Sequence, residues 1–432
     1  MELSKLEAKE IIMEQCRNLN QLNFRQHEER EERERNPYQR DYARIIYSSS
    51  FRRLQGKMQL IGIDTSKSYR NRLTHSLEVS QIARGIADKI KNKTGCQNLY
   101  QDDMYVIEAC SISHDIGNPP FGHYGERVLD KQCADIGGFE GNAQTIRVLT
   151  KLEHKFPKYR GLNLTYRTQL GLIKYFVQKE RKRKKFIYED TYKEYKGILM
   201  DHVDVHPRTL DVQIIDIADE IAYAVHDLED ALSLKLFTID EFMYEFRRYL
   251  KQKRADEQCI QTMEKIVLKA KDVANSAANY NSSEEYSMLL RNELTSSLVH
   301  RLMSDIGLVR VDSQFKDLTG TANDYELGFN HLELLAYGLK KFTFKCINRT
   351  DDVILYERTG EKAIKGLYEI FSDAKYNKNG MLLPVQYRPI QKDDPKELKR
   401  CAVDYIAGMM DTYAIDVYKK YYGNKSLDKL YE

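Results

Sequence analysis

Residue types that bind metal ions recur along the chain as His75, the adjacent pair His114-Asp115, and Asp219. Two imidazole nitrogens and two carboxylate oxygens form a mixed set that suits Mn²⁺, Fe²⁺, Mg²⁺ or Zn²⁺. An octahedral ion held by these groups keeps positions for a water and for a phosphate oxygen, so it can polarise a phosphoryl group and acidify the water. The residues therefore predict one divalent metal ion per subunit, Mg²⁺ or Mn²⁺ before Fe²⁺ or Zn²⁺, and phosphohydrolase chemistry.

The sequence around each candidate ligand determines how strongly that residue indicates a metal site. His75 shares an apolar helical stripe with Val79, where a lone histidine is more often a hydrogen-bonded core residue. His114 and Asp115 are followed by Gly117 and a Pro-Pro pair that ends a helix, and adjacent side chains converge on one ion most easily at a helix end. The order His, His-Asp, Asp on three helices is a stronger signal than any single pair.

Two further pairs have spacings that suit the same reaction. His123 and Glu126 lie three residues apart after the Pro-Pro turn, so they face the same side of a helical turn. A carboxylate beside an imidazole orients the ring and raises its pKa, which prepares it for proton transfer as an acid or as a base. Tyr223 and Asp227 follow Asp219 at four-residue steps on one helix face, which indicates either a recognition stripe or a solvent face.

The elements that must position these residues are helices. Only 8 prolines and 22 glycines interrupt 432 residues, and apolar residues recur at helical spacing, which indicates an all-α fold. We predict helices over residues 72–93, 101–114, 141–152, 165–179, 211–234 and 396–421, a loop over 377–384, and short strands at 61–65 and 186–190. We expect Glu140, just before the third of these helices, to accept a hydrogen bond from a metal-site histidine. The predicted domains are a charged helical arm (1–37), a catalytic core (38–235) and a helical C-terminal region (236–432) packed on the core, which contributes to the substrate pocket and to oligomer contacts.

Charge and cysteine content exclude several classes of protein. With 68 basic and 65 acidic residues the net charge is only +3, so composition does not indicate a nucleic-acid binder. The basic cluster from Arg181 to Lys185 is interpreted as an exposed loop or as a site for an anionic partner such as single-stranded nucleic acid. Cations near the first ligand helix, among them Lys57 and Arg72, either supply a field for phosphates or lie on a surface. Seven cysteines without CxxC pairs and no apolar membrane-spanning window predict a soluble, cytoplasmic protein with no membrane partner.

Several stretches of the chain resemble one family closely. RRLQGKMQL, RLTHSLEVSQIARGIA, HDIGNPPFGHYGE, FEGNAQTIRVL, GLNLTYRT, ADEIAYAVHDLEDAL and DYIAGMMDTYA are similar to motifs of the deoxyguanosinetriphosphate triphosphohydrolases of the HD-domain superfamily. The resemblance runs from about Arg40 to Glu229, is weak between about 236 and 380, and resumes over 384–421. It departs from the usual pattern at KMQLI, where the family has KTQVF, and at ADEIAY, where it has ADDIAY.

The resemblance implies an HD-domain helical core that assembles into a hexamer or tetramer and cleaves a deoxynucleoside triphosphate (dNTP) to deoxynucleoside and tripolyphosphate. His75, His114, Asp115 and Asp219 match the family's metal ligands, and His123, Glu126 and Asn163 match its catalytic residues. The residues that match its substrate-binding positions are Gln59 for sugar and base, Lys174 and Tyr175 for phosphates, Tyr223 and Asp227 for the deoxyribose, and, more loosely, Arg291 for a phosphate.

Two other functions remain open at this level. One is a different mononuclear HD phosphohydrolase that acts on nucleoside monophosphates or cyclic nucleotides. The dinuclear enzymes need extra histidines after the His-Asp pair, and here only His123 follows closely. The other is a non-catalytic sensor of nucleotides or nucleic acid on the same scaffold, which has no need for both metal ligands and a His123-Glu126 pair.

Overall fold

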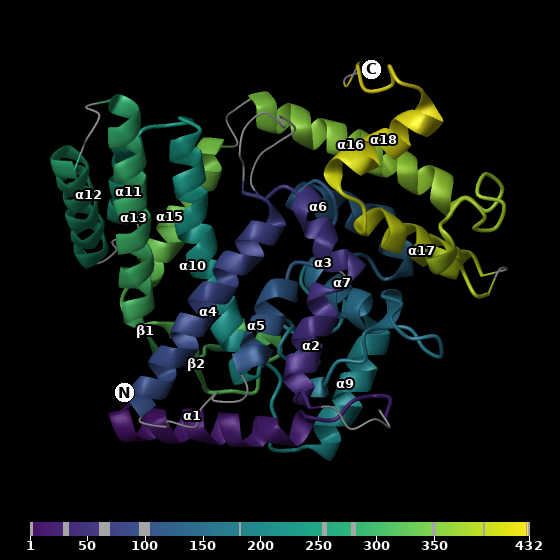
Figure 1. The fold of residues 1–432 in the computed structure, drawn as a ribbon, viewed down its shortest axis with the longest axis horizontal. Coiled ribbons are helices and arrows are strands. Elements are labelled where there is room, and N and C mark those ends of the chain that lie inside the picture. Colours follow the sequence, from purple (N-terminus) through teal and green to yellow (C-terminus); the bar gives the residue numbers. More distant parts are fainter. Residues whose placement is uncertain are drawn as a thin grey trace. The chain divides into compact units, whose positions relative to one another are not determined.

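The computed structural model of the chain describes residues 3–28, 34–59, 70–94, 104–180, 183–252, 257–277, 282–347, 351–391, 394–428 and 430. The described residues are mainly helical, with one two-stranded sheet, which confirms the predicted all-α class (Figure 1). They form two compact units: residues 1–215, 311–324 and 355–432 in the first, and 216–310 and 325–354 in the second. The domain boundaries expected after residues 37 and 235 stay a prediction. In the part of the chain that the structure describes, no helix has the length and apolar character to cross a membrane.

The first unit contains the helices that carry most of the predicted site. Its helices are α1 (Lys5–Leu19), α2 (Pro37–Ile46), α3 (Ser49–Arg53), α4 (Arg72–Thr94), α5 (Met104–Ser113), α6 (Gly122–Gln132), α7 (Gly141–Arg147), α8 (Tyr166–Leu170), α9 (Glu189–Asp201), α14 (Ser313–Thr319), α17 (Pro395–Ala407) and α18 (Asp411–Tyr422), with most of α16 (Asp351–Ser372). A π-helical turn, η4 (Val148–Leu152), extends α7, and short 3₁₀ turns are η1 (Asn20–Leu22), η2 (Leu54–Gly56), η3 (Ala134–Ile136) and η5 (Val385–Tyr387).

The second unit is built around the long helix α10 (Leu210–Ser233), which begins in the first unit. Its other helices are α11 (Ile239–Gln252), α12 (Glu257–Ala277), α13 (Ser283–Asp305) and α15 (Glu333–Ile347). Strands β1 (Ile306–Arg310) and β2 (Tyr325–Phe329) pair antiparallel, with Ile306 opposite Phe329. We did not predict these strands, because each is short and the helices around them dominate the periodicity.

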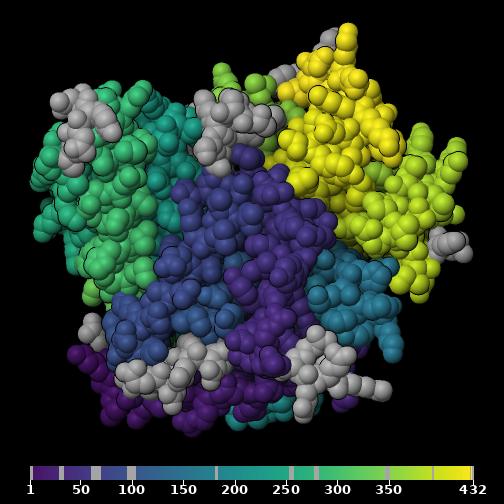
Figure 2. All heavy atoms as spheres, viewed as in Figure 1, coloured from purple at the N-terminus to yellow at the C-terminus, as the bar shows by residue number. Residues whose placement is uncertain are grey.

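Two apolar clusters hold the elements of the site. The face of α4 that carries Val79 and Ile86 is fully buried and packs on α5, whose Ile107 is also fully buried. The second cluster joins α6, α16, α17 and α18 through residues such as Leu129 and Ile406. Helices α17 and α18, yellow in Figure 2, form a continuous part of the surface of the first unit. The chain on both sides of the His114-Asp115 turn is therefore anchored in packed helices.

The local apolar periodicity predicted most of these helices correctly, but several predicted helix ends are wrong. The predictions for 72–93 and 211–234 agree with α4 and α10, that for 101–114 contains α5, and that for 141–152 matches α7 with η4. The prediction over 165–179 is wrong beyond Leu170, where the chain turns at Gly171 against Cys110. The single helix over 396–421 is wrong because α17 ends at Ala407 and α18 starts at Asp411. The strand at 186–190 is wrong, since α9 begins at Glu189, and the strand at 61–65 lies outside the described residues.

Candidate active site

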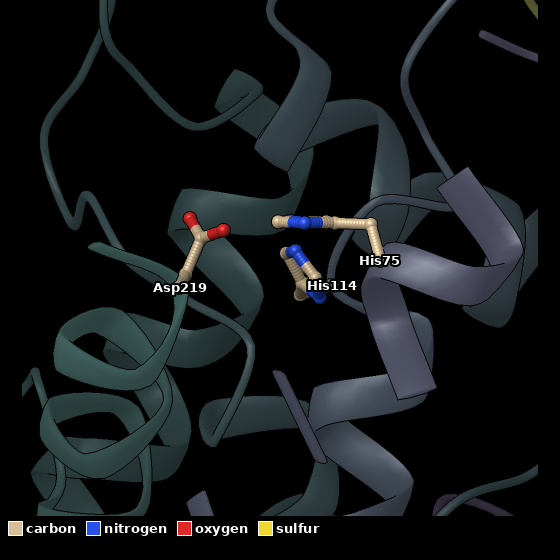
Figure 3. Close-up of side chains that lie close together, drawn as sticks. All are labelled: His75, His114 and Asp219. Carbon is tan, nitrogen blue, oxygen red and sulfur yellow. The ribbon is translucent and has the colours of Figure 1, made fainter. Parts of the chain in front are cut away.

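Three of the four predicted metal ligands come together. His75 is fully buried in the first turn of α4, and His114 lies in the turn after α5, where its Nδ1 donates to the Ser111 carbonyl at 2.6 Å. That bond leaves Nε2 as the ring nitrogen with a lone pair for a ligand. One ligand atom from each of His75, His114 and Asp219 lies within 4.8 Å of the other two, and Figure 3 shows the two rings and the carboxylate turned toward one another.

The donor set fits a divalent metal ion. Nitrogen and carboxylate ligands sit about 2.0–2.2 Å from an ion such as Zn²⁺, so two ligands of one ion are at most about 4.4 Å apart. The 4.8 Å bound on the group is close to this value, which leaves only a small adjustment for binding. Two imidazoles and one carboxylate suit Mn²⁺, Fe²⁺ or Zn²⁺, and further oxygen ligands bring the set toward Mg²⁺.

Asp115 lies next to this group but has other contacts. Its Oδ2 accepts from Nη1 of Arg72 at 2.5 Å, and its Oδ1 accepts from Nδ2 of Asn118 at 2.5 Å. The Arg72 side chain is only 2% exposed, so this ion pair is shielded from water. Oδ1 also lies 3.6 Å from Nε2 of His114. The role of Asp115 as a fourth ligand stays a prediction, and it requires the ion to compete with Arg72 for the carboxylate.

The predicted catalytic pair is formed in the first turns of α6. Nδ1 of His123 lies 3.1 Å from Oε2 of Glu126, and the His123 side chain is 58% exposed, so its ring is open to an incoming molecule. Burial raises the pKa of Glu126, but the hydrogen bond to His123 and the charge of Lys185 outweigh it and lower the pKa to about 2. Glu126 is therefore a carboxylate at neutral pH and can orient the His123 ring.

A half-buried lysine supports this pair, and sequence reasoning missed it. Nζ of Lys185 lies 3.3 Å from Oε1 of Glu126 and donates to Oε1 of Glu140 at 2.8 Å. Glu140 is fully buried and also accepts from the Ala143 backbone N–H and from the amide of Asn142. These groups, and not a metal-site histidine as we expected, are its partners. The only signal for Lys185 was its place at the end of the basic cluster.

Among the described residues of the basic cluster, Arg183 has different partners. Arg181 lies outside the described residues, and Arg183 donates to the Asp317 carbonyl at 2.7 Å and to Glu180 at 3.3 Å. The interpretation of the cluster as a site for single-stranded nucleic acid stays a prediction.

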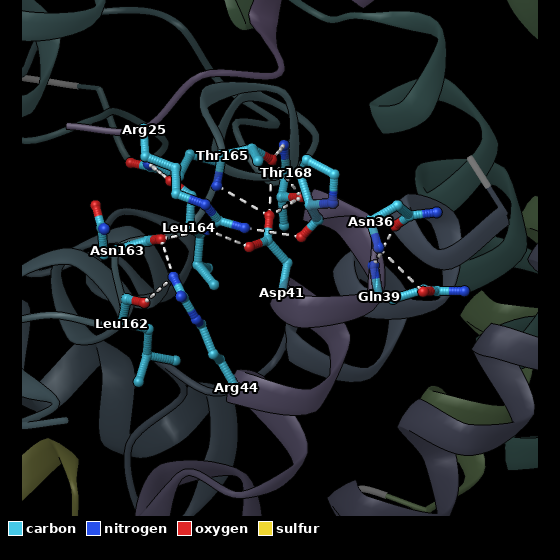
Figure 4. Close-up of polar contacts among 12 residues, drawn as sticks. Arg25, Asn36, Gln39, Asp41, Arg44, Leu162, Asn163, Leu164, Thr165 and Thr168 are labelled. Atoms are coloured by element: carbon cyan, nitrogen blue, oxygen red, sulfur yellow. Dashed lines mark hydrogen bonds and ion pairs between the residues drawn. The ribbon is translucent and has the colours of Figure 1, made fainter. Parts of the chain in front are cut away.

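Asn163 links the loop before α8 to the N-terminal segment. Its Oδ1 accepts from the His27 N–H at 3.1 Å, and its Nδ2 donates to the His27 carbonyl at 2.9 Å. Its own carbonyl accepts from the guanidinium groups of Arg25 and Arg44 (Figure 4). Its φ of +51° is in the left-handed region, which asparagine tolerates better than most residues. In this structure the Asn163 side chain is hydrogen-bonded to the backbone of His27. Its catalytic role stays a prediction.

That loop is fixed by one buried carboxylate. Asp41 of α2 is fully buried and accepts from Arg25 at 2.5 Å, from the Thr165 N–H at 2.9 Å and from the hydroxyls of Thr165 and Thr168 at 2.7 and 2.8 Å (Figure 4). A carboxylate that accepts several hydrogen bonds in the interior has its charge satisfied. Asp41 therefore holds the loop that presents Asn163.

The remaining predicted substrate residues are distributed over both units. In the first, Gln59 is 9% exposed, the Lys174 carbonyl accepts from Arg208 at 2.9 Å, and the Tyr175 ring lies 5.9 Å from Nζ of Lys185. In the second, Nζ of Lys340 lies 5.0 Å from the centre of the Tyr223 ring, and Asp227 is 7% exposed. Nη1 of Arg291 donates to the Ser287 hydroxyl one turn earlier in α13, at 2.7 Å. Their roles toward a substrate stay predictions.

Comparison with known proteins places the chain in one family. The family model of the HD domain matches residues 72–224, and that of the phosphohydrolase-associated domain matches residues 331–420. The chain is 47% identical over 427 residues to deoxyguanosinetriphosphate triphosphohydrolase-like protein 2 of Vibrio cholerae, with 98% of each chain covered. It is 34% identical over 436 residues to the deoxyguanosinetriphosphate triphosphohydrolase-like protein of Shewanella pealeana, with 91% of this chain and 93% of the relative covered. The resemblance seen in the sequence is confirmed, and the chain belongs to the deoxyguanosinetriphosphate triphosphohydrolase-like family of HD-domain phosphohydrolases.

Proposed function

We propose that this protein is a metal-dependent dNTP triphosphohydrolase, with dGTP among its substrates, that releases deoxynucleoside and tripolyphosphate. The observation that supports it most is the convergence of the ligand atoms of His75, His114 and Asp219 within 4.8 Å. The names of the relatives point to the same reaction. Mg²⁺ or Mn²⁺ is the proposed ion, one per subunit, in a hexamer or tetramer.

The chemistry of the site follows from its residues. A divalent ion bound there supplies a Lewis acid that polarises the phosphoryl group and acidifies a water. His123, held through Nδ1 by the Glu126 carboxylate, presents Nε2 for proton transfer to the leaving 5′-oxygen or from the attacking water. A positioned acid or base of this kind contributes about 10²–10⁴ in rate. The hydrogen bond to His123 and the charge of Lys185 lower the pKa of Glu126, and the orienting carboxylate is ionised at neutral pH.

The substrate would be recognised through its sugar and its phosphates. We propose that Tyr223 packs under C2′ and excludes a 2′-hydroxyl, while Asp227 accepts a hydrogen bond from the 3′-hydroxyl. The proposed contacts elsewhere are Lys174, Tyr175 and Arg291 with phosphates, Gln59 with sugar or base, and Asn163 with the reacting phosphate.

The reaction products test this function directly. Purified protein is incubated with each dNTP and with Mg²⁺ or Mn²⁺, and the products are separated by anion-exchange chromatography. Deoxynucleoside and tripolyphosphate are expected, whereas pyrophosphate or stepwise orthophosphate would refute the proposal. His114→Ala is expected to abolish both turnover and Mn²⁺ binding measured by calorimetry. His300→Ala, an exposed histidine of α13, is the matched control and should change neither.

A further inference from the structure

The turn that delivers the catalytic pair has an unfavourable backbone. After Pro119 and Pro120, Phe121 has a φ of +62° and Gly122 a φ of +56°, and His123 follows at once. A bulky residue such as phenylalanine rarely adopts a left-handed conformation unless its surroundings impose it. The direction in which His123 leaves the turn therefore depends on what holds Phe121.

Phe121 is held from the far end of the chain by Asp411. Oδ1 of Asp411 accepts from the Phe121 N–H at 3.0 Å, although 290 residues separate them. Oδ2 accepts from the Met58 N–H at 2.9 Å and from the Tyr356 hydroxyl at 2.7 Å. Asp411 is the first residue of α18 and is 4% exposed. One buried carboxylate thus ties the catalytic turn to α16 and to the segment that leads into Gln59.

The Phe121 ring is held from the same side. It packs edge-on against Tyr356, with ring centres 5.3 Å apart. It also lies over Gly360 of α16, where an added Cβ would come within 2.5 Å of the ring. Both the backbone and the side chain of Phe121 therefore depend on residues of the C-terminal part of the first unit.

The other side of the turn is held by a buried lysine. Lys57 is 2% exposed, and its Nζ donates to the carbonyl of Asn118 and, at 2.8 Å, to the carbonyl of Ala407 at the end of α17. Lys57 precedes Met58, which is a second partner of Asp411, so the two charged residues bracket residues 118–121. Asp411 of α18 thus binds Phe121 directly, and Lys57 links the other end of the turn to the end of α17.

We infer that Asp411 is a positioning residue of the phosphohydrolase site, which sets the catalytic turn so that His123 and Glu126 face the substrate. The inference rests on the proposed function and goes beyond it, because it assigns a task in catalysis to the phosphohydrolase-associated segment. The alternative is a contact that only stabilises the fold. Burial raises the pKa of Asp411 above its ordinary value despite three hydrogen-bond donors and Lys57, so the ionised carboxylate is less favourable in this position than in water. If this position served stability alone, well-packed apolar side chains would stabilise the fold at least as well as a buried carboxyl group.

Asp411→Asn tests the inference with almost no change in volume. Asparagine keeps one acceptor oxygen, but its NH2 group replaces the other and is itself a donor. The side chain therefore cannot accept hydrogen bonds from Phe121, Met58 and Tyr356 together. A small displacement of a catalytic group costs about 100-fold in rate, so we expect kcat to fall about 10- to 100-fold, with KM and Mn²⁺ affinity changed less than about threefold. Tyr356→Phe, which removes one of the three donors, should lower kcat about threefold. Asp416→Asn, an exposed carboxylate on α18, is the matched control and should leave kcat unchanged.

A double-mutant cycle separates positioning from stability. With His123→Gln as background, Asp411→Asn should cost less than about threefold in kcat, because the group that it positions is already gone. Full additivity, or an Asp411→Asn variant with wild-type kcat, would overturn the inference. Should Asp411→Asn fail to fold, the cycle with Tyr356→Phe decides in its place: the loss of about threefold in kcat in the wild-type background should be absent in the His123→Gln background, and an equal loss in both would overturn the inference.

A second measurement does not depend on activity. Hydrogen exchange followed by mass spectrometry should show faster exchange in Asp411→Asn at residues 118–126 and 57–59, and no change in Asp416→Asn. If the wild-type protein released no tripolyphosphate, the proposed function would fail while this experiment still tested the contact. Unchanged exchange at 118–126 in Asp411→Asn would show that Asp411 does not hold the turn.

Discussion

Lys185 offers the sharpest test of the electrostatics around the proposed catalytic pair, His123 and Glu126. It is the cation shared by Glu126 and Glu140, at 3.3 and 2.8 Å, and its side chain is 31% exposed. Lys185→Met removes the charge and keeps much of the apolar stem. It leaves two carboxylates that had been near one ammonium group, and the one on Glu140 is fully buried. We therefore expect a loss of stability that depends on pH.

The pKa of Glu126 sets the size of this effect. It falls from an ordinary 4.5 to about 2 in the folded protein, which corresponds to about 3 kcal/mol from all its partners together. Because the folded pKa lies below the unfolded one, ionised Glu126 stabilises the fold above pH 4.5, and this stability is lost as the pH falls toward 2. Lys185 is one of two main causes and is partly solvated, so its removal should cost about 2 kcal/mol near neutral pH.

The assay is urea unfolding of the wild-type and variant proteins at about pH 7, 5 and 3.5. The stability difference between them should be largest at pH 7 and should shrink at the lowest pH, where the unpaired carboxyls of the variant take up protons. Lys184→Met, the exposed neighbouring lysine, should unfold like the wild type at every pH. A Lys185→Met difference that is constant across this range, or absent, would refute the reasoning.

Three other variants probe the remaining contacts. Asp404 is 2% exposed and accepts hydrogen bonds from Nε and Nη2 of Arg147. Asp404→Ala should therefore lower the free energy of unfolding in urea by about 3–5 kcal/mol, because it leaves the Arg147 charge buried and unpaired. Adding Arg147→Met should recover part of this loss, and no recovery would mean that the unpaired charge is not its cause. Asn163→Ala removes both side-chain bonds to the N-terminal segment, so hydrogen exchange at residues 24–27 should quicken with a loss of about 1–3 kcal/mol, and unchanged exchange would contradict the observed contact. Tyr223→Ala should raise GTP turnover relative to dGTP turnover, and an unchanged ratio would exclude Tyr223 from sugar selection.

Local sequence information predicted the helices that carry ligands better than the ends of those helices. Residues such as Val79 repeat at helical spacing within α4, and this repeat is contained in the segment itself. The end of α17 at Ala407 is not contained in its own segment. The turn at Gly408 depends on the position of α18, which is set by contacts with distant residues. The strands β1 and β2 were missed for a related reason, since each is defined by its partner and not by its own pattern.

The chemistry of the proposed site was determined by residue types that the sequence displays: imidazoles at 75 and 114, a carboxylate at 219, and a His-Glu pair three residues apart. The competition among charged groups was decided only by the tertiary structure. It pairs Asp115 with Arg72, shares Lys185 between Glu126 and Glu140, and brings Asp411 to the turn at Phe121. The physical reason is that a buried charge must find a partner, and which partner is near depends on the path of the backbone over tens to hundreds of residues. No periodicity within a single helix contains that path.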